Sequence, residues 1–469
     1  MKKRLSILIP LYNEQVFIGE LLSRVMAAPL PEDLDREIIV VDDCSTDSSA
    51  EIAATMAKQF PQIQLVRQAK NRGKGAALRR GIELAKGEYI VIQDADLEYD
   101  PRDWTRMLSP LLDGRADAVF GSRFATSQER RVLYFWHSLA NRMLTLACNV
   151  ICDLNLTDME TCYKMVRTSL LQSIPLTSDR FGFEPEVTIK LARRRARIYE
   201  VAVSYSGRTY EEGKKIGLSD AFDALLTILR FGVSNDVYKD PGQQILHAMS
   251  LARRFNRWMI DVVKPFVGAR VLEFGAGMGN LTRVLCPARE LYVATDIEGE
   301  NLARLSNLLS HYPQLEIHEG DVGRPEQFRT FANRVDTTVC LNVLEHVKDD
   351  LEGLRTMREV LMSGGRAIVL VPEGKNIYGR LDEVLGHYRR YSKEELTTKM
   401  REAGFEIERV LSFNRISRPG WFVTGRVLKK NTVNPSQIKI FDSLVWLWRR
   451  IDDLLPWSPV SLIAIGRKP

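Results

Sequence analysis

Carboxylates follow two apolar runs in the first hundred residues of the chain. Asp42 and Asp43 close the run EIIVVDD, and Asp94 and Asp96 follow the run YIVIQ. In open parallel sheets, ligands bind beyond the carboxyl ends of the strands, which is where these acids are expected to lie. Two carboxylates two residues apart can hold a hard divalent cation whose other positions take diphosphate oxygens. The spacing therefore predicts a site for a nucleoside diphosphate.

A lone pair of this kind is also common at turns, so the prediction depends on its context. Three further segments, PLYNE, VVDDCSTD and NRGKGAALRRG, precede QDADLEYDP. The glycines of NRGKGAALRRG permit a close backbone approach, and Lys74 within it supplies a positive charge. Together, these segments favour a phosphate ligand over a plain turn.

A second group of residues begins at VLEFGAGMGNLT, where Glu273 precedes Gly275, Gly277 and Gly279. Glycines at a strand-to-helix turn allow a ligand to lie against the backbone. The spacing differs from the GxGxxG of dinucleotide-binding folds, and the acid comes before the glycines rather than after them. Asp296 ends the next apolar run, where it is suited to bind ribose hydroxyls, and Asp321 and the segment CLNVLEHV follow.

Both groups are expected at the ends of buried strands. In the first third of the chain, the runs LSILIPLY, EIIVVDD, IQLVRQ and YIVIQDAD alternate with helical patterns near 14–28, 47–59 and 74–86. Short apolar runs that alternate with helices of this length indicate βαβ units and a parallel sheet. The sequence therefore predicts an α/β fold for this part.

The same rhythm restarts at residue 270, so a second sheet is expected. Its strands are predicted at RVLEF, ELYVATD, LEIHEG, TTVCLN, RAIVLVP, FEIERVLSF and SLIAIGRKP. An Asp-Pro-Gly breaker places the boundary near 236–242. We predict a first domain over 1–235, a linker and leading helix over 236–262, and a second domain over 263–469.

The composition is that of a folded protein. Among 469 residues, 45% are hydrophobic and 27% charged, and the net charge of +6 is too mild for dedicated nucleic-acid binding. The six cysteines lack a CxxC pair, which indicates reduced thiols in a cytoplasmic protein. Polar residues interrupt the first apolar run and the stretch 133–152, so we expect no signal peptide, no membrane span and only peripheral contact at the inner face of the membrane.

The first constellation resembles the family 2 glycosyltransferases, and more narrowly the dolichyl- or polyprenyl-phosphate sugar synthases. The resemblance covers about residues 5–230 and extends through FGSRF, LTDMETCYKMVR, RFGFEPEVTIKLA and SYSGRTYEEGKK. It implies a nucleotide-diphospho-sugar transferase (GT-A) fold. It also implies a nucleoside site at Pro10, Tyr12, Glu14, Val41 and Asp43, with Asp94, Ala95 and Asp96 on the diphosphate.

By the same resemblance, Mg²⁺ or Mn²⁺ would be held by Asp94, Asp96 and Glu98. Such mannose synthases usually carry Gln where this chain has Glu98, which leaves the metal and the sugar open. Arg123, Arg208 and Lys214 match positions that hold the donor diphosphate or an acceptor phosphate. An acceptor that is already an anion needs no general base, so Asp94, Asp96 and Arg123 are the expected catalytic residues.

The second constellation resembles class I S-adenosylmethionine-dependent methyltransferases, which have a Rossmann-like fold, over about residues 245–469. The resemblance implies that Glu273, Gly275 and Gly277 approach the methionine part of the cofactor and Asp296 its ribose. Asp321 and Val322 would meet the adenine and Asn342 the rim of the fourth strand. Glu345 and His346 are candidate bases for a hydroxyl acceptor. In HYRRYSKEEL, substrate contact and plain surface charge are equally open for His387, Arg389, Arg390 and Tyr391.

We therefore expect a bifunctional enzyme of cell-envelope glycan synthesis that transfers a sugar to a polyprenyl phosphate and methylates a related glycan or lipid. One alternative is a sugar-hydroxyl acceptor, which would need a base near Glu184 or Glu186. Another is a second domain that binds without catalysis. A tryptophan-rich insert in the tail could cover a lipid or pack between the domains; its tryptophans are Trp421, Trp446, Trp448 and Trp457.

Overall fold

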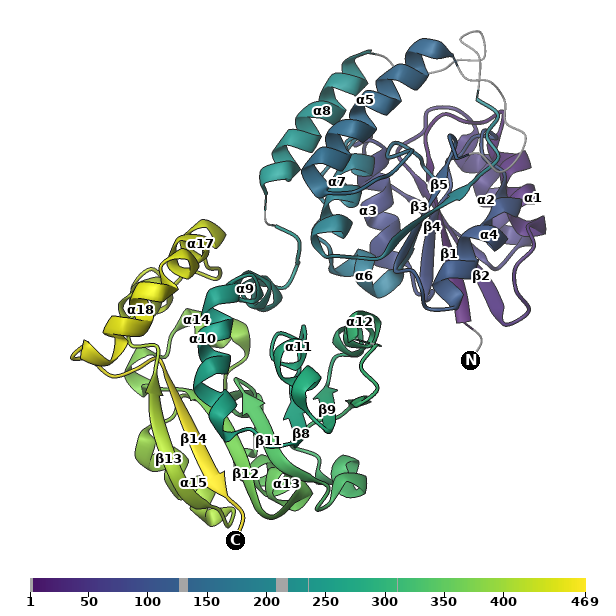
Figure 1. The fold of residues 1–469 in the computed structure, drawn as a ribbon. Helices are drawn as coiled ribbons and strands as arrows, with labels where there is room; N and C mark the ends of the chain where they lie inside the picture. Colours follow the sequence, from purple (N-terminus) through teal and green to yellow (C-terminus); the bar gives the residue numbers. More distant parts are fainter. Residues whose placement is uncertain (1–2, 126–133, 208–217, 235, 310) are drawn as a thin grey trace. The chain divides into compact units, whose positions relative to one another are not determined.

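The structure is a computed structural model that describes residues 3–125, 134–207, 218–234, 236–309 and 311–469. The chain forms two compact units, Met1–Lys239 and Asp240–Pro469 (Figure 1). Their division falls inside the segment 236–262, where we predict the linker. The Asp-Pro-Gly sequence there begins a helix, because Asp240 Oδ1 accepts a hydrogen bond from the backbone N–H of Gln243 at 2.7 Å.

The first unit contains a seven-stranded sheet with the order β3-β2-β1-β4-β6-β5-β7. The strands are β1 (Lys3–Leu11), β2 (Leu34–Asp42), β3 (Ile63–Arg67), β4 (Tyr89–Ile92), β5 (Ala118–Ser122), β6 (Lys164–Arg167) and β7 (Ile198–Ala202). The helices are α1 (Ile18–Ala27), α2 (Ser49–Gln59), α3 (Lys74–Leu84), α4 (Trp104–Leu112), α5 (Phe135–Cys152), α6 (Thr168–Ser173), α7 (Phe183–Arg193) and α8 (Leu218–Val233).

The predicted strands and helices of this unit are confirmed, but the sheet is not wholly parallel. Strand β6 runs antiparallel to both β4 and β5. The alternation of apolar runs and helices indicates where strands lie but does not encode the direction of a late, short strand. The carboxyl ends of β1, β2 and β4 still share one edge, because these three strands are parallel. That edge carries the predicted carboxylates.

The second unit contains a seven-stranded sheet with the order β10-β9-β8-β11-β12-β14-β13. Its strands are β8 (Arg270–Phe274), β9 (Leu291–Asp296), β10 (Leu315–Glu319), β11 (Val335–Leu341), β12 (Leu361–Pro372), β13 (Glu406–Phe413) and β14 (Ser461–Arg467). Its helices are α9 (Pro241–Ser250), α10 (Arg253–Val263), α11 (Thr282–Leu285), α12 (Gly299–Leu309), α13 (Asp350–Val360), α14 (Arg380–Leu385), α15 (Lys393–Glu402), α16 (Arg418–Trp421), α17 (Pro435–Ser443) and α18 (Val445–Ile451).

All seven strands predicted for the second unit are confirmed. Strand β14 is antiparallel to its neighbours β12 and β13, and the remaining pairs are parallel. Between β13 and β14, the tryptophan-rich insert packs within its own unit. The indole of Trp448 donates to the carbonyl of Phe441, that of Trp457 to Arg415, and that of Trp421 to Asp382.

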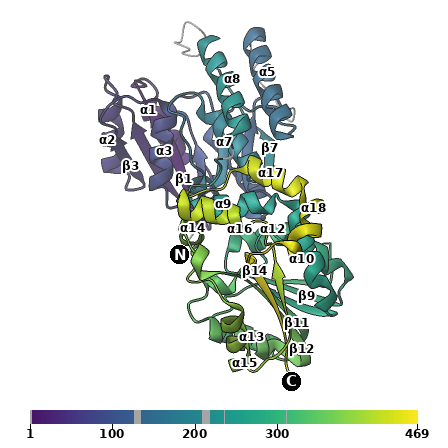
Figure 2. The same cartoon turned by 90° about the vertical axis from the view of Figure 1, so that its left-hand side faces the viewer.

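Two helices of the first unit carry an unusual surface. Helices α5 and α8 lie side by side and extend beyond the sheet in both views (Figures 1 and 2). Both are amphipathic, with large apolar side chains left exposed. None of the helices in the described ranges is long and apolar enough to span a bilayer.

Candidate active sites

Asp43 organises the loop that follows β3. Its Oδ1 accepts hydrogen bonds from Gln68 Nε2 at 2.7 Å and from the backbone N–H of Arg72 at 2.9 Å, and its Oδ2 accepts from the backbone N–H of Gly73 at 2.6 Å. The residue is only 3% exposed. Asp43 therefore shapes the glycine-containing loop at the strand edge, where we predict contact with a nucleoside.

The other residues predicted for the nucleoside surround the ends of β1 and β2. Val41 is buried in β2, Pro10 and Glu14 are partly buried, and Tyr12 is 41% exposed. The backbone N–H of Glu14 donates to Ser49 Oγ at 2.8 Å, which ties the loop after β1 to the start of α2. The residues predicted for this site thus lie on neighbouring strand ends.

The two glycines that flank Lys74 serve the protein backbone itself. Gly73 has a φ of +100°, and a Cβ on Gly75 would lie 2.3 Å from the carbonyl oxygen of Ser178. The close approach that we expect here is therefore made by the loop 178–180. Beside it, a cavity of about 540 Å³ is lined by Lys70, Asn71, Arg72, Asp179 and Arg180. Its three cations make it suited to an anionic ligand.

Lys74 joins two carboxylates at this edge. Its Nζ lies 2.8 Å from Asp94 Oδ1 and 2.9 Å from Glu184 Oε1. Burial opposes the charge of the ammonium group, but the two carboxylates outweigh it and raise the pKa of Lys74 well above its usual value. The protein partner of Asp94 at this edge is therefore a lysine.

Asp96 and Glu98 have different neighbours from Asp94. Asp96 Oδ1 accepts from the backbone N–H of Glu98 at 3.1 Å, and Glu98 Oε2 accepts from the Tyr205 hydroxyl at 2.7 Å. Among the residues that the structure describes, Asp94, Asp96 and Glu98 do not form a trio whose oxygens lie within 4.8 Å of one another. Their carboxylates provide the oxygen ligands that Mg²⁺ or Mn²⁺ prefers. Ala95, between Asp94 and Asp96, is buried.

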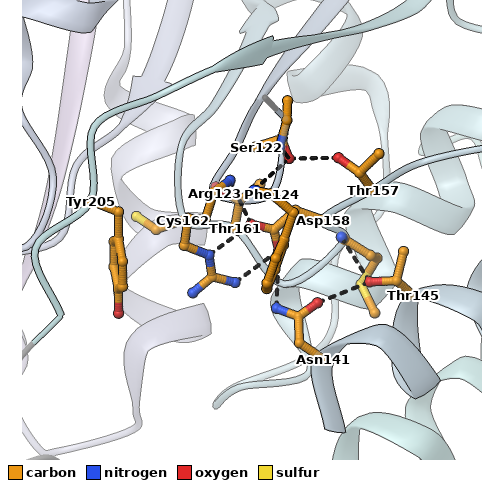
Figure 3. A network of polar contacts seen from close by, with 12 residues as sticks. Ser122, Arg123, Phe124, Asn141, Thr145, Thr157, Asp158, Thr161, Cys162 and Tyr205 are labelled. Carbon is orange, nitrogen blue, oxygen red and sulfur yellow. Dashed lines mark hydrogen bonds and ion pairs between the residues drawn. The ribbon is translucent and has the colours of Figure 1, made fainter. Parts of the chain in front are cut away.

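Arg123 is held by an aspartate that the sequence reasoning missed. Its Nε and Nη2 lie 2.7 and 2.8 Å from the two oxygens of Asp158. On the opposite side of the guanidinium, the ring of Tyr205 makes a cation–π contact (Figure 3). Asn141 Nδ2 of α5 donates to Asp158 Oδ1 at 3.0 Å. Although burial opposes its charge, Arg123 keeps the pKa of Asp158 below its usual value. Arg208 and Lys214 lie outside the described residues.

A buried base and a partly buried acid of the same unit were also missed. Lys164 is fully buried and donates to the carbonyls of Met159 and Thr161 at 2.7 and 2.6 Å. Burial, and then the charge of Glu184, raise the pKa of Glu160 to about 8. Both residues lie in the segment LTDMETCYKM, whose polar residues among apolar ones were the available signal.

In the second unit, the glycine turn after β8 has the backbone that only glycine adopts easily. Gly275, Gly277 and Gly279 have φ of +71°, +52° and +73°. A Cβ on Gly275 would lie 2.3 Å from Val343 Cγ2, whereas nothing lies within 4 Å of a Cβ on Gly277. The backbone N–H of Gly277 donates to Asp296 Oδ2 at 2.7 Å. The turn and Asp296 are thus brought together, with open space at Gly277.

Glu273 points into the domain core. Its Oε2 accepts from the hydroxyls of Thr282 at 2.6 Å and Tyr292 at 2.8 Å, and the residue is 4% exposed. Burial raises the pKa of Glu273 to about 7, although both hydroxyls oppose the shift. Its carboxylate therefore supports the turn from beneath.

The remaining residues predicted for the cofactor lie along the same edge. Asp321 Oδ1 accepts from the backbone N–H of Gly323 at 2.9 Å, and Val322 is 3% exposed. Asn342 follows β11 with a φ of +55° and is exposed. These residues follow β10 and β11, so the structure gathers them with Asp296 at the carboxyl ends of the parallel strands.

Glu345, His346 and His387 form a cluster at that edge. One ligand atom from each lies within 4.8 Å of the other two, and no second group of three such side chains occurs in the described ranges. Burial raises the pKa of Glu345 to about 7 against the opposing charge of His387. Burial, and then His387, lower the pKa of His346 to about 4.

Two further residues of HYRRYSKEEL, Arg390 and Tyr391, lie in the interior. Arg390 is 1% exposed, and its Nε donates to Asp382 Oδ1 at 2.8 Å. Tyr391 is buried and donates to Asp350 Oδ2 at 2.8 Å, and Arg389 pairs with the same carboxylate. Arg390 is therefore not a surface charge, because it is buried and paired with a buried aspartate.

Comparison with known proteins agrees with this division into two units. Residues 6–174 match the model of glycosyl transferase family 2, and residues 272–367 match that of a methyltransferase domain. The chain is 30% identical over 227 residues to a dodecaprenyl-phosphate galacturonate synthase of Rhizobium johnstonii, across 48% of this chain and 65% of the relative. It therefore spans slightly less than two thirds of that relative.

Two other similarities concern one unit each. An undecaprenyl-phosphate mannosyltransferase of Micrococcus luteus is 29% identical over 241 residues, across 49% of this chain and 95% of the relative. A solved S-adenosylmethionine-dependent methyltransferase of Thermotoga maritima, described as a possible histamine N-methyltransferase, superimposes with a TM-score of 0.32 and 17% identity, across 47% of this chain and 92% of that chain. The chain thus joins a glycosyltransferase domain of family 2, of GT-A-like fold and with homologues among polyprenyl-phosphate sugar transferases, to a Rossmann-like methyltransferase domain.

Proposed function

We propose that the first unit transfers a sugar from a nucleoside-diphosphate sugar to a polyprenyl phosphate such as undecaprenyl or dolichyl phosphate. We propose further that the second unit uses S-adenosylmethionine to methylate that glycan, the lipid or a related intermediate. The observation that carries the lipid acceptor is the exposed apolar face of α5 and α8, because α5 is also hydrogen-bonded to the Arg123 site.

The apolar face is large for a surface in water. On α5, Trp136 is 75% and Val150 76% exposed, and on α8 Leu229 is 54% and Val233 82% exposed. Other exposed apolar side chains of the two helices recur at intervals of three or four residues, so they lie on one side of each helix. They are Phe135, Leu139, Met143, Leu146, Phe222, Leu225 and Leu226. Contiguous exposed apolar residues mark an interaction surface, and amphipathic helices bind at the boundary of a bilayer. We assign this face to peripheral membrane contact.

The same helix leads to the phosphate-binding charge. Asn141 of α5 binds Asp158, and Asp158 holds Arg123 through two nitrogens. A prenyl chain that lies along the apolar face would bring its phosphate toward this arginine. Arginine suits that role because its guanidinium binds phosphate oxygens in a bidentate manner. Arg208 and Lys214 are proposed to assist it.

For the donor, we assign the nucleoside to Pro10, Tyr12, Glu14, Val41 and Asp43 and the diphosphate to Asp94, Ala95 and Asp96. Asp94, Asp96 and Glu98 would hold Mg²⁺ or Mn²⁺, which would neutralise the leaving diphosphate when bound. The acceptor phosphate oxygen attacks the anomeric carbon, and the bond to the nucleoside diphosphate breaks with inversion. No base is required, because the acceptor is already ionised.

The sugar-hydroxyl alternative would require a free carboxylate base. Glu186 is fully buried and binds Lys190 Nζ at 2.8 Å and the backbone N–H of Ser178 at 2.7 Å. Glu184 is ion-paired with Lys74 at 2.9 Å. Both acids are thus engaged with protein cations, which favours the phosphate acceptor.

For the methyl donor, we assign the methionine part to the turn at Glu273, Gly275 and Gly277, where the space beside Gly277 is open. Asp296 would take the ribose, Asp321 and Val322 the adenine, and Asn342 the rim. Glu345 and His346 lie beyond Asn342, where they can serve a hydroxyl acceptor. Calorimetry with S-adenosylmethionine tests this assignment, and a failure to bind would favour the non-catalytic alternative.

Transfer of labelled sugar to lipid tests the first activity. Purified protein with Mg²⁺ or Mn²⁺ and undecaprenyl phosphate in detergent is incubated with radiolabelled GDP-mannose, GDP-glucose, UDP-glucose or UDP-N-acetylglucosamine. We expect one donor to label the organic phase, with loss of labelling in Asp96→Asn and retention in the exposed-surface control Asp113→Asn. Nucleotide release without labelled lipid would support the hydroxyl acceptor instead.

Vesicle flotation tests the membrane face with a matched pair of valines. Val150 on α5 is 76% exposed and Val16, away from that helix pair in the sequence, is 75% exposed. On vesicles that contain phosphatidylglycerol, we expect Val150→Glu to weaken binding and Val16→Glu to leave it unchanged. Equal binding of the two variants would show that the apolar face of α5 and α8 does not bind the membrane.

A further inference from the structure

We propose that Glu345, His346 and His387 bind a divalent transition-metal ion, for which Zn²⁺ is the best match, at the edge assigned to the methyl acceptor. This site is separate from the cation proposed for Asp94, Asp96 and Glu98. Its ligands come from two segments, the turn Leu344–His346 after β11 and the loop after α14.

The three side chains converge on one point. Their ligand atoms all lie within 4.8 Å of one another, and the rings of His346 and His387 are 4.8 Å apart and nearly perpendicular. His387 Nε2 lies 3.9 Å from Glu345 Oε1, which is too long for a hydrogen bond. In a tetrahedral site with zinc bonds of about 2.1 Å, two ligand atoms lie about 3.4 Å apart, so a shift of about half an ångström would bring these two atoms to one ion.

Glu345 provides the second, independent observation. The residue is fully buried, and neither Oε1 nor Oε2 has a hydrogen-bond partner in the described part of the chain. A buried carboxylate without partners is unfavourable unless it is paired, protonated or bound to a metal. The backbone of this residue is fixed as well, because its carbonyl accepts from the N–H of Tyr388 at 2.9 Å. The carboxylate is therefore held beside two imidazoles.

His387 is oriented as metal-binding histidines usually are. Its Nδ1 lies 2.9 Å from Asp382 Oδ1, which leaves Nε2 directed at Glu345. Asp382 is itself buried and accepts from Arg390 Nε at 2.8 Å and from the backbone N–H of Gly379 at 3.0 Å. A carboxylate behind the second ring nitrogen fixes the tautomer and strengthens the ligand.

The set of donors selects the kind of ion. Two imidazole nitrogens and one carboxylate oxygen suit zinc and its neighbours in the first transition row, whereas Mg²⁺ and Ca²⁺ prefer oxygen ligands alone. Three protein ligands leave a fourth position for water or substrate, as in catalytic zinc sites. His346 is only partly buried, so that fourth position can be reached from solvent.

At this location the ion would activate the methyl acceptor, a role that rests on the methyl transfer proposed above. Val343, two residues before Glu345, packs against the turn at Gly275, so the cluster borders the cofactor edge. An acceptor hydroxyl at the fourth position would lose its proton to solvent water more readily. Its oxygen then attacks the methyl carbon of the sulfonium, the carbon–sulfur bond breaks, and its electron pair returns to sulfur as a neutral thioether.

Metal binding tests the proposal without any turnover. The full chain, free of any affinity tag and stripped with a chelator, is titrated with Zn²⁺ and separately with Co²⁺, whose visible spectrum reports nitrogen and oxygen ligands. The comparison uses Glu345→Gln, His387→Ala, Asp382→Asn and, as a matched control, His318→Ala. His318 is an exposed histidine of the same unit that lies 3.5 Å from Glu316.

We expect one Zn²⁺ per chain that persists in Asp96→Asn and in His318→Ala but is lost in Glu345→Gln and His387→Ala. Asp382→Asn should bind about 10- to 100-fold more weakly, as for other carboxylates behind a ligating histidine. Circular dichroism identifies any variant that fails to fold, and the wild-type Co²⁺ spectrum then decides alone. Absence of a Co²⁺ spectrum in the wild type, or equal binding by folded Glu345→Gln, would overturn the proposal.

Calorimetry of the metal-free chain with S-adenosylmethionine separates the two proposals. Cofactor binding without zinc binding would overturn the metal site and leave the methyltransferase assignment intact. Zinc binding without cofactor binding would support the metal site and contradict the assigned use.

Discussion

The two candidate sites differ in how their acidic residues are paired. In the first unit, Lys74 lies between Asp94 and Glu184, and Arg123 holds Asp158, so these three acids have a cation, whereas Glu160 beside them has a pKa raised to about 8. In the second, Glu273 has only two neutral hydroxyls, and Glu345 has no hydrogen-bond partner among the described residues. The pKa values follow: that of Asp158 is lowered, and those of Glu273 and Glu345 are raised to about 7.

This difference shows how the same side chain is prepared for different partners. Paired acids in the first site already contact a lysine or an arginine, which a bound cation could replace. Burial makes the charged form of the unpaired acids in the second site unfavourable, and binding of a proton or a cation removes this penalty.

The largest effect is expected when the cation of the first site is removed. Lys74→Met leaves Asp94 and the buried Glu184 without their shared partner, and removing the partner of a buried acid costs at most about 3–5 kcal/mol. Hydrogen exchange of the peptide that covers α3 and β4 measures the change, and sugar transfer should be lost as well. The control Lys3→Met removes an exposed pair with Glu88 and should change stability by about 1 kcal/mol or less. Equal protection in the two variants would contradict the paired-charge account.

A smaller, pH-dependent effect is expected for Glu273→Gln. The folded protein holds this proton up to a pKa of about 7, whereas the unfolded chain releases it near 4.5. The folded state therefore binds more protons, and stability from this group is present below pH 4.5 and falls as the pH rises toward 7. The variant lacks this loss, on the order of 3 kcal/mol, and its stability relative to wild type should rise between pH 4.5 and 7.5.

Urea unfolding followed by tryptophan fluorescence measures this difference, because five of the seven tryptophans lie in the second unit. Glu290→Gln, at an exposed position of the same unit, is the control and should show no such dependence. A constant offset between Glu273→Gln and wild type from pH 4.5 to 7.5 would contradict the raised pKa.

The smallest effect separates two glycines of one turn. Gly275→Ala and Gly277→Ala both place a side chain at positive φ, at about 1 kcal/mol each. Only the former adds a clash, with Val343, so it should unfold at a lower urea concentration. Gly277→Ala fills the open space and should mainly weaken S-adenosylmethionine binding in calorimetry. The reverse ranking in the two measurements would place the cofactor elsewhere.

Much of the fold was predictable from sequence because buried strands are continuous apolar runs. Strands β8 to β14 and the first four strands follow such runs closely. The direction of β6 was not predictable, because its four residues carry no signal for the neighbours they pair with. The Asp-Pro-Gly segment was predicted as a breaker ahead of a leading helix, whereas Asp240 caps a helix that begins at Pro241 itself.

The candidate sites were predictable where the residues follow strands and not where they depend on distant partners. Asp43, Asp94 and Asp296 stand at strand ends, so position alone points to them. Asp158 lies 35 residues from Arg123, and only the fold brings the two together. Arg390 lies in a run of charges that resembles a solvated surface, yet Asp382 draws it into the interior.

The central claim is that one chain carries two working transferases, the first with a lipid-phosphate acceptor. It is tested most directly by incubating the full chain with undecaprenyl phosphate, a ¹⁴C-labelled sugar nucleotide and S-adenosyl-[methyl-³H]methionine, followed by organic extraction. We predict ¹⁴C in the lipid phase that disappears in Asp96→Asn, and ³H in the products that decreases in Gly277→Ala while ¹⁴C remains. Released nucleotide with no ¹⁴C in lipid from any donor would contradict the account.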